Sequence, residues 1–245
     1  NAGYWWSLPV VAETWDGWLS DINGFHVKPE HAMNAIANAK PGPVAEGNVG
    51  GGTGMICHEF KCGTGTSSRI VDVLGKAYTV GVLVQANYGV RETLRVAGVP
   101  VGLEITHDQA YDTPQAPSGD TGSIIIVVAT NAPLLPHQLK RLARRAALGL
   151  ARNGSYAGNG SGDIFIAFST ANDPASRSDA LALLEMVPND EIDPLFLATV
   201  QATEEAIINA MIAAKDITGN ESNSAKAIRH DELRAVLKKY NRLAN

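Results

Sequence analysis

The stretch "DTGSIIIVVAT", residues 120–130, lies close to the midpoint of a 245-residue chain and contains its most apolar strand signal. Six consecutive apolar residues, from Ile124 to Ala129, predict a buried strand. The Thr-Gly-Ser before them is typical of a turn, and strands commonly begin after turns. The unusual feature is that a flexible Gly122-Ser123 pair opens the most apolar strand of the chain.

The residues that follow this strand predict helices packed on sheets. A second strand is predicted at 163–170, and the helix between the two strands runs from Pro136 to about Arg152 with apolar residues at helical spacing. Two more helices are predicted to begin at Asp193 and Asp231. The elements alternate without a regular βαβ rhythm, which favours the α+β class.

The first half of the chain is rich in glycine and in short strand signals. Strands are predicted within 52–60, 69–75 and 77–89, and a helix from Pro29 with Met33 and Ile36 on one face. Residues 107–122 hold two prolines, two glycines and several polar turn formers, which predicts an exposed loop.

Composition places limits on the class of protein. With 45% apolar and 18% charged residues, the chain can bury one large core or two small ones. The net charge of −5 does not favour nucleic acid as a partner. No apolar run approaches the roughly 20 residues that span a bilayer, and no signal peptide is visible, so we expect no membrane partner and a cytoplasmic protein. A periplasmic location would follow if a signal peptide had been removed.

The two cysteines, Cys57 and Cys62, do not form a CxxC pair. A disulfide between them is one possibility. Two free thiols in a reducing compartment are the expected state, because disulfides are uncommon in such compartments.

Several common catalytic motifs are absent from the sequence. The glycine run "GNVGGGTG" (47–54) matches neither a phosphate-binding loop nor a dinucleotide fingerprint, and no G-x-S-x-G elbow occurs. The six histidines show no metal-ligand spacing. We therefore predict no metal and no organic cofactor.

Ser123 remains as a candidate nucleophile. A serine hydroxyl needs a base to remove its proton, and an N-terminal serine carries one itself, since an α-amine has a pKa of roughly 7.7–8.0. Ser123 would become N-terminal if the Gly122–Ser123 bond were cut. Glycine before the bond tolerates the strained backbone that attack on its carbonyl requires. The alternative is an ordinary turn followed by a strand.

Longer motifs around these residues point to a known family. The segment "GDTGSIIIVVATNAPLLPHQLKRLARRAALGLARNGSYAGNGSGDIFIAFSTAN" (119–172) closely resembles the L-aminopeptidase D-Ala-esterase/amidase family, which includes the β-peptidyl aminopeptidases. So do "VVAETWDGWLSDINGFHV" (10–27), "GGGTGMICHEFKCGTGTSSRIV" (50–71) and "VLVQANYG" (82–89). The resemblance covers essentially the whole chain.

The resemblance implies a self-processing serine aminopeptidase. Such a precursor cuts itself before a serine, which here would divide a single domain, 1–245, into segments 1–122 and 123–245. The fold implied is a four-layer αββα sandwich, similar to N-terminal-nucleophile hydrolases but differently connected. The implied substrates are small peptides, amides or esters, and the implied assembly is a homo-oligomer of αβ units. Precursors of the family carry a further segment before the position of Asn1, so we expect that the N-terminal part of the family domain is absent here.

The resemblance also implies roles for individual residues. Ser123 matches the nucleophile, with Gly122 before the cut. Asn87 matches an oxyanion-hole asparagine. Ser161 and Asp163 match a serine and acid pair that orients the nucleophile's amine, although some relatives have Glu in place of Asp163.

Two further residues are implied at the substrate site. Trp15 lies where a second oxyanion donor is expected, a position held by tyrosine in at least one relative, and an indole N–H can replace that hydroxyl. Glu13 matches the carboxylate that receives the free amine of the substrate.

Two other functions remain open from the sequence. One is acyl transfer on the same scaffold, as in ornithine acetyltransferases, which use a threonine nucleophile instead of Ser123. The other is a non-catalytic remnant that keeps the motif without a working site.

Overall fold

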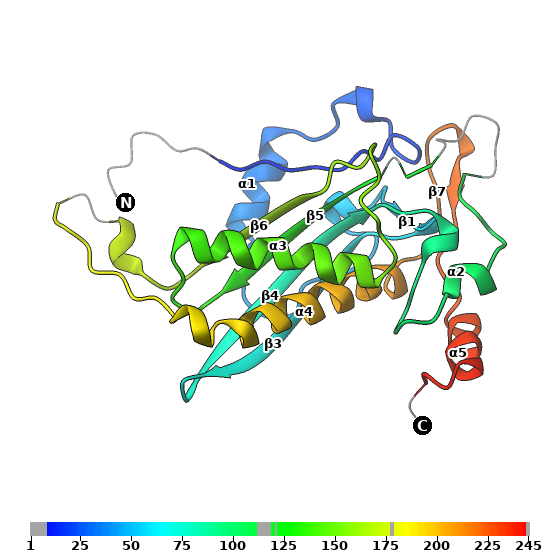
Figure 1. Ribbon diagram of the computed structural model, residues 1–245. Coiled ribbons are helices and arrows are strands. Elements are labelled where there is room, and N and C mark those ends of the chain that lie inside the picture. The colour runs from blue at the N-terminus through cyan, green and yellow to red at the C-terminus, as the bar shows by residue number, and fades with distance from the viewer. Residues whose placement is uncertain (1–8, 112–118, 121, 177–178, 244–245) are drawn as a thin grey trace.

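A four-stranded sheet forms the centre of the structure, a computed structural model that describes residues 9–111, 119–120, 122–176 and 179–243 (Figure 1). The strand order is β3-β4-β5-β6. The strands are β3 (Thr64–Val73), β4 (Lys76–Asn87), β5 (Ser123–Thr130) and β6 (Ile164–Ser169). Strands β3 and β4 pair antiparallel, as do β4 and β5, and β6 is parallel to β5. Strand β5 is therefore an inner strand.

Two long helices cover one face of this sheet (Figure 1). Helix α3 (Pro136–Arg152) connects β5 to β6, as a parallel pair requires, and packs on β6 and β5. Helix α4 (Asp193–Ile212) packs on β3 and β4 and against α3. Helix α4 passes a length and composition test for a membrane span, but 61% of its apolar window is buried inside the structure. It is a core helix here.

The two faces of the sheet differ in burial. Alternate residues of the inner strands face the helices and are almost fully buried, among them Val80, Val82, Val84, Ile124, Ile126 and Val128. On the other face, Leu83, Ile164 and Phe168 are 36%, 46% and 46% exposed. The predicted α+β class is confirmed. Of the four layers that the resemblance implied, the described residues form the four-stranded sheet and its helical cover, and the other two sheets are two-stranded.

Smaller elements surround the ends of the sheet. A short hairpin joins β1 (Ile56–Cys57) to β2 (Phe60–Lys61), and a second pairs β7 (Ile217–Thr218) with β8 (Ser224–Ala225). Three further helices are α1 (Pro29–Ala37), α2 (Val101–Glu104) and α5 (His230–Lys239). Short 3-10 turns lie at Ile22–Gly24, Gly50–Gly52, Arg91–Thr93, Asp173–Ser176, Asn189–Glu191 and Asn220–Ser222.

Most predicted elements are present. The helix at 136–152 and the helix start at Asp193 are confirmed, and the last helix begins one residue earlier than predicted. Helix α1 is present, but its predicted apolar face is exposed, including Met33 and Ile36. Of the predicted loop 107–122, residues 112–118 and 121 lie outside the described residues.

The prediction of two free thiols is wrong. Cys57 and Cys62 form a disulfide, with Cα atoms 5.4 Å apart, and both residues are buried. The cause is the β1–β2 hairpin, because Cys57 pairs with Phe60 in the register and the chain turns back on itself within the intervening residues. A Cα distance of this size is favourable for a disulfide. Sequence spacing alone did not reveal the turn.

Candidate active site

Ser123 is the first residue of β5 and lies directly opposite Asn87, the last residue of β4. Directly opposed residues on antiparallel strands project to the same face, with Cβ atoms about 4.5–5.5 Å apart. The backbone N–H of Gly162 donates a hydrogen bond of 3.2 Å to Ser123 Oγ. Strand register therefore brings together a hydroxyl from β5 and an amide from β4, which lie 36 residues apart in the chain.

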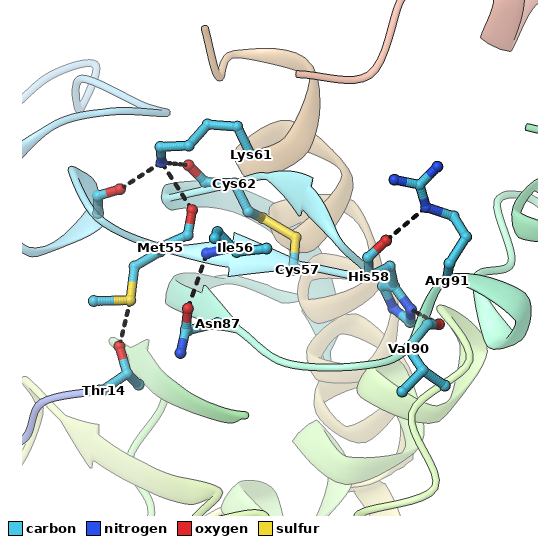
Figure 2. Close-up of a disulfide and its surroundings, with 11 residues drawn as sticks. Thr14, Met55, Ile56, Cys57, His58, Lys61, Cys62, Asn87, Val90 and Arg91 are labelled. Atoms are coloured by element: carbon cyan, nitrogen blue, oxygen red, sulfur yellow. Dashed lines mark hydrogen bonds between the residues drawn. A yellow bond between two sulfur atoms is a disulfide. The ribbon is translucent and has the colours of Figure 1, made fainter. Parts of the chain in front are cut away.

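The Asn87 side chain is held in one orientation by two hydrogen bonds. Its Oδ1 accepts from the N–H of Ile56 at 2.8 Å (Figure 2). Its Nδ2 donates to the carbonyl oxygen of Trp15 at 2.7 Å. Asn87 is buried. A primary amide has two N–H bonds, so one remains to donate to a developing oxyanion.

Ser161 and Asp163 lie beside the start of β5, at the entry to β6. Ser161 Oγ donates to Asp163 Oδ1 at 2.5 Å, and the N–H of Ile124 donates to the same oxygen at 3.2 Å. Asp163 Oδ2 is buried and has no hydrogen-bond partner among the described residues. Burial raises the pKa of the Asp163 carboxyl above its usual value, against the two hydrogen bonds, which favour the charged form.

The backbone around the proposed cut is held by an aspartate that the sequence analysis missed. Asp120 is buried, and its two carboxylate oxygens accept from the N–H groups of Gly89 at 3.1 Å and Gly158 at 3.2 Å. It thus links the loop before Gly122 to the end of β4 and to the loop before β6. The motif "GDTGS" contained this residue, but no spacing rule connects it to two distant glycines.

Gly122 lies against the backbone of β4. A Cβ atom built on Gly122 would lie 2.2 Å from the carbonyl oxygen of Asn87 and 2.6 Å from Tyr88 Cα. Both neighbours are backbone atoms, which cannot move aside as a flexible side chain can. The position therefore requires glycine for close approach.

A cavity of about 200 Å³ lies next to Asn87 and Gly122. Its lining residues are Trp15, Ile56, Glu59, Asn87, Tyr88, Gly89, Val90, Gln109, Tyr111, Gly119 and Gly122. Trp15 is thus at the site, although its contact with Asn87 is made by the backbone carbonyl and not by the indole N–H. Glu59 is a carboxylate of this cavity that the sequence analysis did not single out.

Glu13 lies elsewhere. It is exposed and lines a separate cavity of about 500 Å³, together with Asp16, Phe25 and His26. The structure therefore brings Ser123, Asn87, Ser161, Asp163 and Trp15 to one end of the sheet, and it does not bring Glu13 to the same cavity. Within the described ranges, no group of three or more His, Cys, Asp or Glu side chains is arranged to hold a metal ion.

Comparisons with known proteins identify the family of the chain. Residues 1–225 match the profile described as peptidase family S58. The chain is 57% identical to a protein named beta-peptidyl aminopeptidase BapA from Sphingosinicella microcystinivorans, over 98% of this chain and 63% of the relative. It is 48% identical to a protein of the same name from Sphingosinicella xenopeptidilytica, over 94% of this chain and 60% of that relative.

A solved structure shares the fold. The L-aminopeptidase D-Ala-esterase/amidase from Ochrobactrum anthropi, described as a prototype for the serine aminopeptidases and a new variant among the Ntn hydrolase fold, superposes with a TM-score of 0.91 at 52% identity. The match covers 100% of this chain and 66% of that one. The chain thus spans slightly less than two thirds of the length of the relatives it matches.

Proposed function

Because the chain belongs to peptidase family S58, we propose that it is the larger part of a self-processing serine aminopeptidase. The observation that carries this proposal is the placement of Ser123 at the start of an inner strand, opposite Asn87 and directly after a glycine pressed against β4. The enzyme would release small N-terminal residues from peptides, amides or esters through an acyl-enzyme.

Self-cleavage would begin with attack of Ser123 Oγ on the carbonyl carbon of Gly122. The new C–O bond forms as the C–N bond breaks, and the hydroxyl proton passes to the departing nitrogen. The product is an ester between Gly122 and Ser123 with a free α-amine. Water then hydrolyses the ester, which leaves a carboxylate on Gly122 and restores the serine hydroxyl.

In the cut enzyme, the α-amine of Ser123 would act as the general base. It takes the Oγ proton as Oγ bonds to the substrate carbonyl, and gives that proton to the leaving nitrogen as the C–N bond breaks. Water then attacks the acyl-enzyme by the same route in reverse. The free N–H of Asn87 would donate to the tetrahedral oxygen in both steps, where charge develops.

Asp163 and Ser161 would orient the amine. Asp163 Oδ2, which has no hydrogen-bond partner in the described part of the chain, is an acceptor at the start of β5, and a new chain end at Ser123 supplies a donor. A buried carboxylate oxygen without a partner is costly, so forming this hydrogen bond would stabilise the cut state.

The substrates would carry a free amine. A desolvated carboxylate binds an ammonium well and is penalised when the amine is blocked. Glu13 is the carboxylate that the resemblance implies, and Glu59 is the carboxylate that lines the cavity at Asn87. The relatives' names, beta-peptidyl aminopeptidase and L-aminopeptidase D-Ala-esterase/amidase, support small amide and ester substrates. We further propose a homo-oligomer of αβ units that needs no cofactor and binds neither nucleic acid nor membrane.

The disulfide supports an oxidising compartment for the folded protein, since disulfides persist there and are rare in the cytosol. We therefore propose a periplasmic location in place of the expected cytoplasmic one.

The test is intact-mass analysis combined with a peptidase assay. We expect wild type to show a chain that begins at Ser123 and to hydrolyse alanine p-nitroanilide, while Ser123→Ala shows neither. Ser67→Ala, on β3, is the control and should cut and turn over normally. A Ser123→Ala protein that still hydrolyses the substrate would refute the mechanism. An uncut, inactive wild type would favour the remnant, and transfer to an added amine in place of hydrolysis would favour the acyltransferase.

A further inference from the structure

Lys61 is a buried cation at the candidate site. It lies on β2, is fully buried, and its Nζ donates to three backbone carbonyl oxygens, those of Met55 at 2.8 Å, Gly52 at 3.0 Å and Cys62 at 2.5 Å (Figure 2). All three acceptors are neutral. Lysine is almost never fully buried unless it is paired with an opposite charge. Burial lowers the pKa of Lys61 to about 7, a measure of what this placement costs the ammonium.

One of the three carbonyls belongs to the peptide group that holds Asn87. The carbonyl oxygen of Met55 and the N–H of Ile56 are the two ends of a single peptide unit. Lys61 binds the oxygen end, and the nitrogen end donates to Asn87 Oδ1 at 2.8 Å (Figure 2). A chain of hydrogen bonds therefore runs from the ammonium through one peptide group to the side-chain amide opposite Ser123.

Two physical consequences follow from this chain. A cation on a carbonyl oxygen polarises the peptide and makes its N–H a stronger donor, because linked hydrogen bonds reinforce one another in a low-dielectric interior. The bound peptide is also fixed in space, since Lys61 connects it to the carbonyls of Gly52 and Cys62. Both effects keep Asn87 Oδ1 turned toward Ile56 and its free N–H turned away from it.

We propose that Lys61 is a positioning residue for the oxyanion donor Asn87, acting through the Met55–Ile56 peptide group. This inference rests on the proposed function of Ser123 and Asn87. Lys61 does not contact the reacting atoms, so its effect is on transition-state stabilisation by Asn87 and not on substrate binding. A purely structural lysine would instead stabilise the hairpin without any link to Asn87.

A double-mutant cycle separates these two roles. In processed enzyme, Lys61→Met should lower kcat by about tenfold to 100-fold with KM within threefold, below the roughly 100- to 1,000-fold expected for full loss of an oxyanion donor. In an Asn87→Ala background the same substitution should change kcat by less than threefold, since Lys61 then has no donor to position. Variants too slow to cut themselves can be opened with a protease site engineered directly before Ser123.

The matched control is Lys226→Met. Lys226 is a neighbouring lysine whose side chain is about half exposed and forms an ion pair with Asp216 at 3.5 Å, so kcat should stay within twofold of wild type. If Lys61→Met does not fold, Lys61→Gln keeps a donor in the cavity without the charge and serves in the same cycle.

If Lys61→Met lowered kcat by the same factor in wild type and in Asn87→Ala, the proposal would be overturned. An effect of Lys61→Met on KM alone, or no loss of kcat, would also overturn it. A second readout does not depend on turnover. The side-chain amide signals of Asn87 in a ¹⁵N-labelled protein should shift in the Lys61 variant and not in Lys226→Met, and unchanged signals would also overturn it. An inactive wild type would refute the proposed function, while the amide signals would still decide the role of Lys61.

Discussion

The sheet end, formed by Asn87, Ser123 and Asp163, and the segment of residues 9–27 are both implied in the site, yet they are built differently. At the sheet end, strand register and hydrogen bonds fix each side chain. Residues 9–27 are mostly irregular, and Val10, Val11, Phe25 and Val27 are largely exposed. For residues in a sheet, a sequence motif predicts the geometry of the side chains, because strand register determines it. For residues in an irregular segment, the position depends on contacts with residues outside the motif.

The largest effect is expected at Asn87. In processed enzyme, Asn87→Ala should lower kcat about 100- to 1,000-fold with little change in KM, because the lost N–H acts on charge that develops only in the transition state. Steady-state kinetics on alanine p-nitroanilide measure this. Asn131→Ala, beyond the opposite end of β5, is the control. If the kcat of Asn87→Ala lay within threefold of wild type, the sheet end would hold no important hydrogen-bond donor to the oxyanion. The contrast with residues 9–27 would then be wrong.

The next effect tests how tightly the sheet end is packed. His58 is fully buried against Tyr88, and desolvation lowers its pKa from 6.5 to about 4. Between these values the unfolded chain binds a proton that the folded chain does not. The stabilisation of the folded protein by neutral His58 is therefore fully present above pH 6.5. As the pH falls toward 4, it is lost, and the free energy of unfolding decreases by about 3 kcal/mol in total.

Urea unfolding at pH 7 and pH 4 measures this loss, in an uncut Ser123→Ala background so that unfolding involves a single chain. The free energy of unfolding differs between the two pH values, and His58→Gln should reduce that difference by about 3 kcal/mol. His137→Gln, at an exposed histidine, should leave the difference as it was. An unchanged difference in His58→Gln would mean that His58 is hydrated and that the sheet end is more open than the structure describes.

A smaller effect is expected on self-cleavage at Gly122. A Cβ there would clash with β4 backbone, and Gly122→Ala should slow cleavage by about tenfold or more, since strain of 1–3 kcal/mol must be relieved before attack. The rate can be followed by gel analysis after synthesis is stopped. Gly81→Ala is the control, because its nearest neighbour would lie 4.0 Å away. Normal cleavage by Gly122→Ala would show that the junction is not confined by β4.

The smallest effect is expected in residues 9–27. Wild type should cleave N-acetylated alanine p-nitroanilide at least ~100-fold more slowly than the free-amine compound. Each factor of ten in this ratio corresponds to a free-energy difference of about 1.4 kcal/mol. Glu13→Gln should narrow that ratio by no more than about fivefold, because exposed ion pairs contribute about 0–1 kcal/mol. The same ratio is measured for Glu59→Gln, because Glu59 is the carboxylate that lines the cavity next to Asn87. If Glu13→Gln leaves the ratio unchanged, Glu13 is not part of the site. If it narrows the ratio by more than fivefold, residues 9–27 contribute to the reaction as much as the sheet end does.

The sequence predicted what depends on local pattern. The apolar run after Ser123 predicted β5, and helical spacing predicted the helices that cover it. The resemblance named Asn87, and the register explains why it faces Ser123 although the two residues are distant in the chain.

The sequence did not predict features that arise from chain reversal and burial. The Cys57–Cys62 disulfide needs a tight hairpin that no spacing rule indicated, and the buried ammonium of Lys61 depends on three carbonyls that only the folded loop brings together. Asp120 is a similar case, because its partners Gly89 and Gly158 are distant in sequence. Such contacts have no periodic signature along the chain.

The inner position of β5 has a consequence for refolding. Strands β3 and β4 lie before Ser123, while β5, β6 and both covering helices follow it, so a cut at this point divides one sheet and one core between two polypeptides. Neither polypeptide can complete the sheet without the other. Before the cut, folding is a first-order process, independent of concentration. After the cut, recovery from denaturant becomes second order and slows on dilution, so the chain can renature efficiently only while its two halves are still one molecule.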